Sequence, residues 1–63
     1  MIVIRRTEGS ADIRLANDEL VMLNNALNEV CNGVEIADSE FQTRVGWDRG
    51  DLQELLAQIN GLI

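Results

Sequence analysis

The stretch EFQTRVG, residues 40–46, decides which fold the sequence predicts. Phe41, Thr43 and Val45 alternate along it with charged or amide side chains (Glu40, Gln42 and Arg44). Strict alternation of this kind is typical of a β-strand with one buried face, and a glycine at position 46 ends the pattern. The stretch therefore predicts a third strand, which has to pair with strands formed earlier in the chain.

The earlier strands are predicted by the first sixteen residues. MIVIRR (1–6) is rich in β-branched residues, which favour strands, and TEGS (7–10) has the composition of a turn. In ADIRLA (11–16), Ile13 and Leu15 lie on one side, and Asp12, Arg14 and Ala16 lie on the other. Two β-type runs around a glycine-containing turn predict a hairpin.

A first helix is predicted over residues 18–32. Asn17 is a favourable N-cap, and its two successors are acidic, which suits the positive end of the helix dipole. Gly33 is placed where a C′ glycine ends a helix. The core side of this helix is predicted to consist of residues that recur at helical spacing: Leu20, Leu23, Leu27, Val30 and Cys31.

A second helix is predicted after residue 46. Asp48 and Asp51 resemble a capping box, with Trp47 packing on Leu52 as a hydrophobic staple; an alternative start uses Asp51 as the cap and Glu54 as its partner. Either start gives the same buried side, formed by Leu52, Leu55, Leu56 and Ile59, and Asn60 with Gly61 closes the helix. The sequence pattern does not predict the path of the backbone over residues 34–39.

These elements predict a single α+β domain over residues 1–63, in the order ββαβα. The predicted architecture has two layers: a three-stranded, mostly antiparallel sheet of order 2-1-3, covered on one face by two helices. The connection between strands two and three is then a right-handed crossover. Because the other face of the sheet stays bare and its edges stay unpaired, we expect a homodimer formed through that face or an edge strand.

The composition argues against catalysis and against metal binding. The 63 residues contain no histidine, lysine or tyrosine, and Ser10 and Ser39 have no base to activate them. The lone cysteine, Cys31, is expected to be a buried apolar side chain, and one thiol does not make a zinc site. No phosphate-binding glycine loop is present. The sequence therefore predicts a protein that is not an enzyme and that uses no cofactor.

Charge and hydropathy restrict the partners and the location. The formal net charge is −6, which disfavours nucleic acid and permits a basic protein partner. No apolar run has the length of a signal peptide or a membrane span, and one cysteine fits a reducing compartment. We expect a cytoplasmic protein with a protein partner and no membrane association.

Four asparagines in LNNALNEVCNG (23–33) are unusual for a helix, because the amide competes for backbone groups. Angular positions place Asn24 at the edge of the core, and Asn32 is interpreted as a C-terminal cap. Asn25 and Asn28 fit a solvated surface and a contact surface equally well. An amide carries a donor and an acceptor in fixed geometry, which suits a protein interface. Trp47 is either a core or staple residue or an interface anchor.

NALNEVCNGVEI followed by EFQTRVG and a capped leucine-rich helix resembles a group of small bacterial proteins of unknown function. The resemblance covers roughly residues 20–60, and the arrangement is similar to immunity-type partners of bacterial toxins. It brings no catalytic residue and implies that Asn25, Asn28, Glu29 and Arg44 act together; a candidate partner for Glu29 is an arginine of the sheet or of a loop. The matching positions are Asn25, Ala26, Leu27, Asn28, Glu29, Val30, Gly33, Glu40, Phe41, Arg44 and Gly46.

The functional prediction is a small acidic protein-interaction module, an immunity-like or inhibitor-like partner of a basic protein. Its predicted interface consists of Asn25, Asn28, Glu29, Arg44 and Trp47. The alternative prediction is a structural or accessory homo-oligomer without a separate ligand. A small-molecule site between sheet and helices is disfavoured because so short a chain has little volume to spare.

Overall fold

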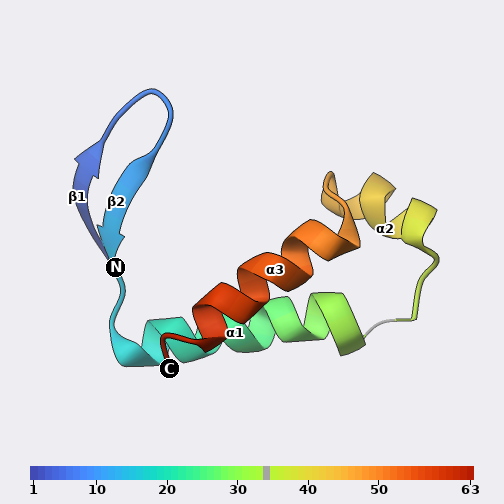
Figure 1. The fold of residues 1–63 in the computed structure, drawn as a ribbon. Helices are drawn as coiled ribbons and strands as arrows, with labels where there is room; N and C mark the ends of the chain where they lie inside the picture. Colours follow the sequence, from blue (N-terminus) through green and yellow to red (C-terminus); the bar gives the residue numbers. More distant parts are fainter. Residues whose placement is uncertain (34) are drawn as a thin grey trace.

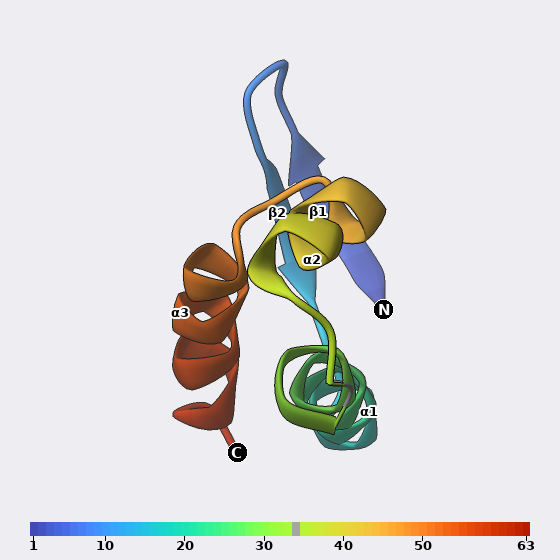
Figure 2. The same ribbon diagram turned by 90° about the vertical axis from the view of Figure 1, so that its right-hand side faces the viewer.

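The computed structural model describes residues 1–33 and 35–63 as a β-hairpin followed by helices. Helices α1 and α3 lie side by side, the hairpin rises at one end of this pair, and α2 lies near the other end (Figure 1). Turning the molecule by 90° shows the hairpin and α2 above α1, with α3 beside it (Figure 2). The elements are β1 (Ile2–Arg6), β2 (Ala11–Arg14), α1 (Asn17–Asn28), a π-helical turn η1 (Glu29–Gly33), α2 (Asp38–Val45) and α3 (Arg49–Asn60).

The predicted hairpin is confirmed. β1 and β2 pair antiparallel, with Val3 opposite Ile13 and Arg5 opposite Asp12, and the register shifts between positions 3 and 5. The turn is closed by the Thr7 amide, which donates to the carbonyl of Ser10 at 2.9 Å, while the two hydroxyls lie 3.0 Å apart. The β-branched run and the TEGS turn thus form the structure that their composition favours.

The first helix covers the predicted range, but its ends differ. The N-cap is Ala16 and not Asn17, and the Glu19 carboxylate accepts the Ala16 amide at 2.9 Å, which satisfies one free donor at the helix start. After Asn28 the chain continues as the π-helical turn η1 through Gly33. The helical stretch ends at Gly33 as predicted, but Gly46 is the glycine with positive φ among the described residues, so Gly33 does not adopt the left-handed conformation usual for a C′ glycine.

The predicted third strand is wrong, because residues 38–45 form helix α2. Phe41 is fully buried and Val45 is half-buried; they are four residues apart and so share one side of a helix. Thr43, which completed the strand pattern, points its hydroxyl back to the Ser39 carbonyl at 3.0 Å. Gly46 ends α2 at φ 84° and donates its amide to the Gln42 carbonyl at 2.8 Å, a left-handed cap that glycine adopts without steric cost.

The predicted covering of a sheet by two helices is wrong as well. The sheet has two strands in the order β1-β2, and in the described part of the chain neither strand packs against a helix. The ββαβα order and the 2-1-3 sheet are therefore replaced by a hairpin beside a helical layer. The Met1 ammonium ties the two parts together through a 2.6 Å ion pair with Glu19.

The small core lies between the helices. Cys31 is 1% exposed, as predicted, and Phe41 and Ile59 are the other two buried side chains of the described residues. Helix α3 begins after Asp48, as the first of the two predicted starts required, but the Asp48 side chain makes no capping hydrogen bond. The capping box is therefore not formed. Trp47 is 67% exposed and is not a core residue. Of residues 34–39, Val34 lies outside the described residues, and Asp38 and Ser39 open α2.

Candidate functional site

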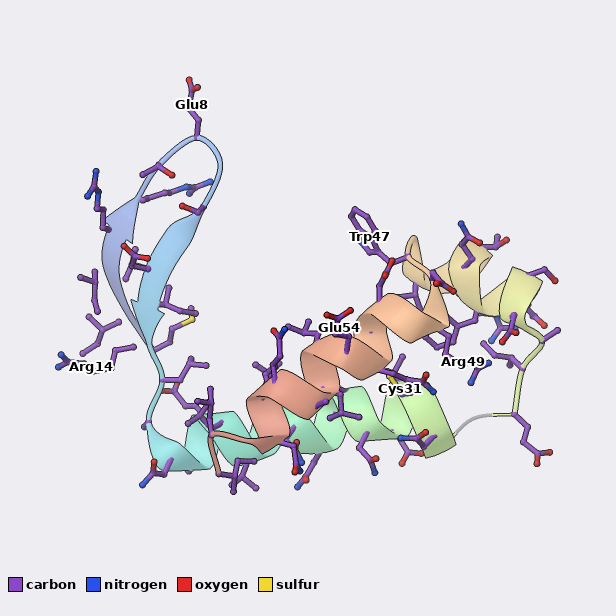
Figure 3. All side chains as sticks on the ribbon, in the orientation of Figure 1. Glu8, Arg14, Cys31, Trp47, Arg49 and Glu54 are labelled. Carbon is purple, nitrogen blue, oxygen red and sulfur yellow. The ribbon has the colours of Figure 1, made fainter. Side chains whose placement is uncertain are left out.

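The structure separates the five residues of the predicted interface into two groups. Asn25 and Asn28 lie in the last turns of α1, and Glu29 follows them as the first residue of η1. Arg44 lies in the last turn of α2, and Trp47 follows that helix and projects away from the helical layer (Figure 3). Helices α1 and α2 do not pack against each other within the described residues. The first three residues therefore form one surface that the other two do not join.

The implied pairing of Glu29 with an arginine is not formed in the described residues. Arg44 instead pairs with Glu40, one turn earlier in α2. The carboxyl group of Glu29 lies against Gly33, where a Cβ would collide with it. Because Gly33 has no side chain, the π-helical turn leaves room for the Glu29 carboxylate.

The asparagines form hydrogen-bonded pairs along one side of the α1–α3 contact. Asn32 donates its amide to Asn28 Oδ1 at 3.0 Å, and Asn60 of α3 donates to Asn24 Oδ1 at 3.2 Å. Asn24 thus connects two helices, whereas Asn32 bonds a side chain and not the helix end. We call this side the asparagine groove; its lining is Asn24, Asn28, Asn32, Gln53, Leu56, Ala57 and Asn60.

Asn25 lies outside the asparagine groove, on the outer side of α1. At 100° per residue it falls about 20° from Asp18 and about 40° from Glu29. Val21, 40% exposed, lies about 40° away on the same side. We call Asp18, Val21, Asn25, Asn28 and Glu29 the outer face of α1; all five are exposed, and Asn28, which also lines the asparagine groove, lies at its border. This face combines two carboxylates, two amides and one apolar side chain.

The most connected side chain of the helical part is Arg49, which sequence reasoning did not single out. Its guanidinium donates to the carbonyl oxygens of Cys31 at 3.0 Å and Ile36 at 2.7 Å. Its Nε donates to Asp38 Oδ1 at 3.1 Å, and its Cζ lies 4.6 Å from the centre of the Phe41 ring. Figure 3 shows Arg49 and Cys31 in the same region between α3 and η1. These contacts hold η1, the following link and α2 against α3, so Arg49 has a structural role.

One signal in the sequence indicated that Arg49 is special. It is the first residue of α3, and a cation at a helix N-terminus is disfavoured by the helix dipole. A basic residue at such a position needs compensating contacts elsewhere. The sequence does not indicate which contacts these are, because two of the three hydrogen-bond acceptors of Arg49 are backbone carbonyls.

A second surface is apolar and includes the hairpin. Met1 and Ile13 line a hollow with Leu15 and two residues of α1, Met22 and Leu23; Glu19 lies at its edge. Met1 and Met22 are 69% and 64% exposed. Apolar side chains gathered in one hollow indicate a contact site more strongly than scattered ones do.

The carboxylates are concentrated in the helical part. Residues 15–63 hold nine carboxylates and two arginines, net −7, whereas residues 1–14 hold three arginines and two carboxylates, net +1. Both arginines of the helical part are engaged with carboxylates, Arg44 with Glu40 and Arg49 with Asp38. The helical part therefore presents a strongly negative surface beside a slightly positive hairpin.

The described residues were compared with the requirements of a metal site and of a membrane span. Within residues 1–33 and 35–63, no three histidine, cysteine or carboxylate side chains lie together as metal ligands would. The Ser10 hydroxyl is paired with Thr7 in the hairpin turn. Among the helices described, none combines the length and the apolar character that crossing a membrane requires.

Comparisons of the chain with protein-family models, with curated proteins and with solved structures find no match. The functional argument therefore rests on the two surfaces, the outer face of α1 and the apolar hairpin, and on the distribution of charge between them.

Proposed function

We propose that this protein is a non-enzymatic interaction module whose negatively charged helical part binds a basic protein partner. The observation that carries the proposal is the net charge of −7 over residues 15–63, where both arginines are already engaged by carboxylates. Charge complementarity of this kind raises association rates and selects partners of opposite sign. A cytoplasmic bacterial setting and the absence of nucleic-acid ligands are part of the same proposal.

The outer face of α1 is the proposed contact surface. Asp18 and Glu29 supply charge, and Asn25 and Asn28 supply donors and acceptors that fix the orientation of a bound chain. Val21, which is 40% exposed, adds an apolar contact at the same place. The resemblance to immunity-type proteins supports a toxin-like basic protein as the partner class.

The test is capture of a partner by the tagged 63-residue chain, with every captured protein identified and its charge calculated. The double variant Asn25→Ala and Asn28→Ala should lose a basic partner that the original protein retains, and added salt should release that partner. Circular dichroism should show unchanged helix content. The matched control is Gln42→Ala, an exposed polar change on α2 away from the outer face of α1. Equal capture by both variants would remove the outer face of α1 from the proposal.

A second candidate function is supported by the exposed hairpin. An accessory protein whose main activity is assembly with copies of itself would present such an apolar element. This candidate needs no basic partner and is tested by the mass of the protein in solution.

A further inference from the structure

Apart from the hollow that Ile13 shares with Met22 and Leu23, the hairpin has no covering surface among the described residues of its own chain. Ile2, Val3 and Ile4 are each 58–60% exposed, and Ile13 is 44% exposed. Neither strand packs against a helix in the described part of the chain. A two-stranded hairpin alone is marginally stable in water and usually needs a further layer. A stable hairpin of this composition therefore requires a surface from outside the chain.

The molecule has a larger accessible surface area than a compact chain of its size, and the excess is about the area that one partner buries in a protein interface. Its accessible surface is 5046 Å² for 7.0 kDa, whereas folded monomers of this mass expose about 4,000 Å². Its radius of gyration is 13.3 Å, whereas about 11 Å is expected for 63 residues. The difference of about 1,000 Å² is close to the roughly 800 Å² that each partner buries in a standard stable interface.

Charge indicates what covers the hairpin. Residues 1–14 carry net +1 and residues 15–63 carry net −7. Two hairpins packed together would bring arginines close to arginines. A hairpin laid on the helices of a second copy would place its arginines near carboxylates. Figure 3 shows Arg14 projecting from the hairpin away from its own helices and Glu54 on the upper side of α3.

The helices offer apolar side chains on the side opposite the asparagine groove. On α3, Leu55 is 46% exposed and lies about 160° around the helix from both Gln53 and Ala57, which line that groove. On α1, Leu23 is 39% exposed and lines the hollow at the base of the hairpin. Both side chains are available to an incoming apolar strand.

We propose that the occupant is a second copy of this chain, in a symmetric dimer with exchanged hairpins. The hairpin of each copy lies on α1 and α3 of the other, with Val3 and Ile13 of one copy against Leu23 and Leu55 of its partner. A two-fold arrangement makes this contact twice with the same residues. This arrangement leaves the outer face of α1 free. The dimer proposal can therefore be tested independently of the proposed basic partner.

The test is sedimentation equilibrium on the full chain, together with three single variants. The original protein should sediment as a dimer, and Ile13→Glu and Leu55→Glu should each weaken the dimer about 30-fold or more, since both charge an anchor position. Gln53→Glu is the matched control: it adds the same charge to the same helix, in the asparagine groove, and should leave the dimer intact. Because neither strand packs against a helix among the described residues, Ile13→Glu should keep the helical circular dichroism signal.

A mixed sample of isotope-labelled and unlabelled copies determines the arrangement even if Leu55→Glu fails to fold. Intermolecular contacts between methyl groups of Ile13 and Leu55 would support the exchanged hairpins. A protein that stays monomeric at about 100 μM, where a micromolar dimer is nearly saturated, would overturn the proposal. So would a dimer whose intermolecular contacts join hairpin to hairpin, or a dimer insensitive to Ile13→Glu. The Asn25→Ala and Asn28→Ala variant should remain dimeric, so loss of partner capture alone concerns only the proposed function.

Discussion

The guanidinium of Arg49 lies over the ring of Phe41, with Cζ 4.6 Å from the ring centre. The same group donates hydrogen bonds to the carbonyls of Cys31 and Ile36 and to the carboxylate of Asp38. One side chain at the start of α3 thus contacts η1, the link after it and α2. In a protein with three buried side chains among its described residues, such a set of contacts carries a large share of the stability.

Arg49→Met should therefore destabilise the protein by about 2–3 kcal/mol. The variant keeps an unbranched, largely apolar side chain, although a shorter one, but leaves two carbonyls without their charged donor and removes the cation–π contact. Arg49→Lys should recover only part of the loss, since an ammonium does not reproduce the planar fork of donors. Urea unfolding followed by circular dichroism measures both.

The control for this prediction is Arg44→Gln. It breaks an exposed ion pair between residues four apart in α2, and such pairs contribute less than about 0.5 kcal/mol. A cost equal to that of Arg49→Met would show that charge loss in general, and not the contacts of Arg49, determines the stability.

The effect of Thr43→Ala on stability distinguishes the observed helix α2 from the strand that the sequence predicted. In a helix, alanine is favoured over threonine by about 0.5 kcal/mol, and the bond from the Thr43 hydroxyl to the Ser39 carbonyl contributes little in compensation. The variant should raise the urea midpoint slightly. In a strand the same change would lower the midpoint, because β-branched residues fit a pleated sheet better than alanine does.

Gly46→Ala should destabilise the protein by about 1–2 kcal/mol. Gly46 has φ 84°, a left-handed conformation in which a Cβ meets the following carbonyl. Gly50 provides the matched control, because it lies in the first turn of α3, where alanine is the better helix former. Thermal or urea unfolding of the two variants should give shifts of opposite sign.

Acid should loosen the junction between the hairpin and α1. The ammonium of Met1 and the amide of Ala16 bond to the Glu19 carboxylate and lower its pKa below the ordinary value of 4.5. A lowered pKa in the folded state means that this contribution to stability is present above 4.5 and is lost as pH falls through the folded value. An NMR titration should place the Glu19 midpoint below 4.5. In Glu19→Gln, the protection of the junction amides from exchange, measured relative to the intrinsic rate at each pH, should no longer change over this pH range; a midpoint at or above 4.5 in the original protein would contradict the assignment.

Sequence reasoning predicted the elements whose signals are local. The β-branched run before TEGS gave the hairpin, and the leucine spacing gave α1 and α3. The strand prediction for residues 40–46 was wrong because two apolar residues spaced four apart fit both the two-residue period of a strand and one turn of a helix. Phe41 and Val45 fit either structure, and only Thr43 between them supported the strand. Seven residues are too few for periodicity alone to separate the two.

The contacts between the elements could not be predicted from the sequence for a different reason. The three polar acceptors of Arg49 lie 18, 13 and 11 residues away, and two are backbone carbonyls, which every residue possesses. The resemblance grouped Asn25, Asn28, Glu29 and Arg44, and Trp47 was added to them as a candidate interface anchor. The direction of α2 relative to α1 then separated Arg44 and Trp47 from the other three, and no local pattern fixes that direction.

The burial of Cys31 has a practical consequence. Its thiol is the only one in the chain and is 1% exposed, so a thiol reagent modifies it only when the helices separate. The rate of labelling therefore reports the opening of the helical layer, without any engineered cysteine. The Cys31 carbonyl also accepts a hydrogen bond from Arg49. The labelling rate of the Cys31 thiol can therefore be compared between the original protein and each variant described above.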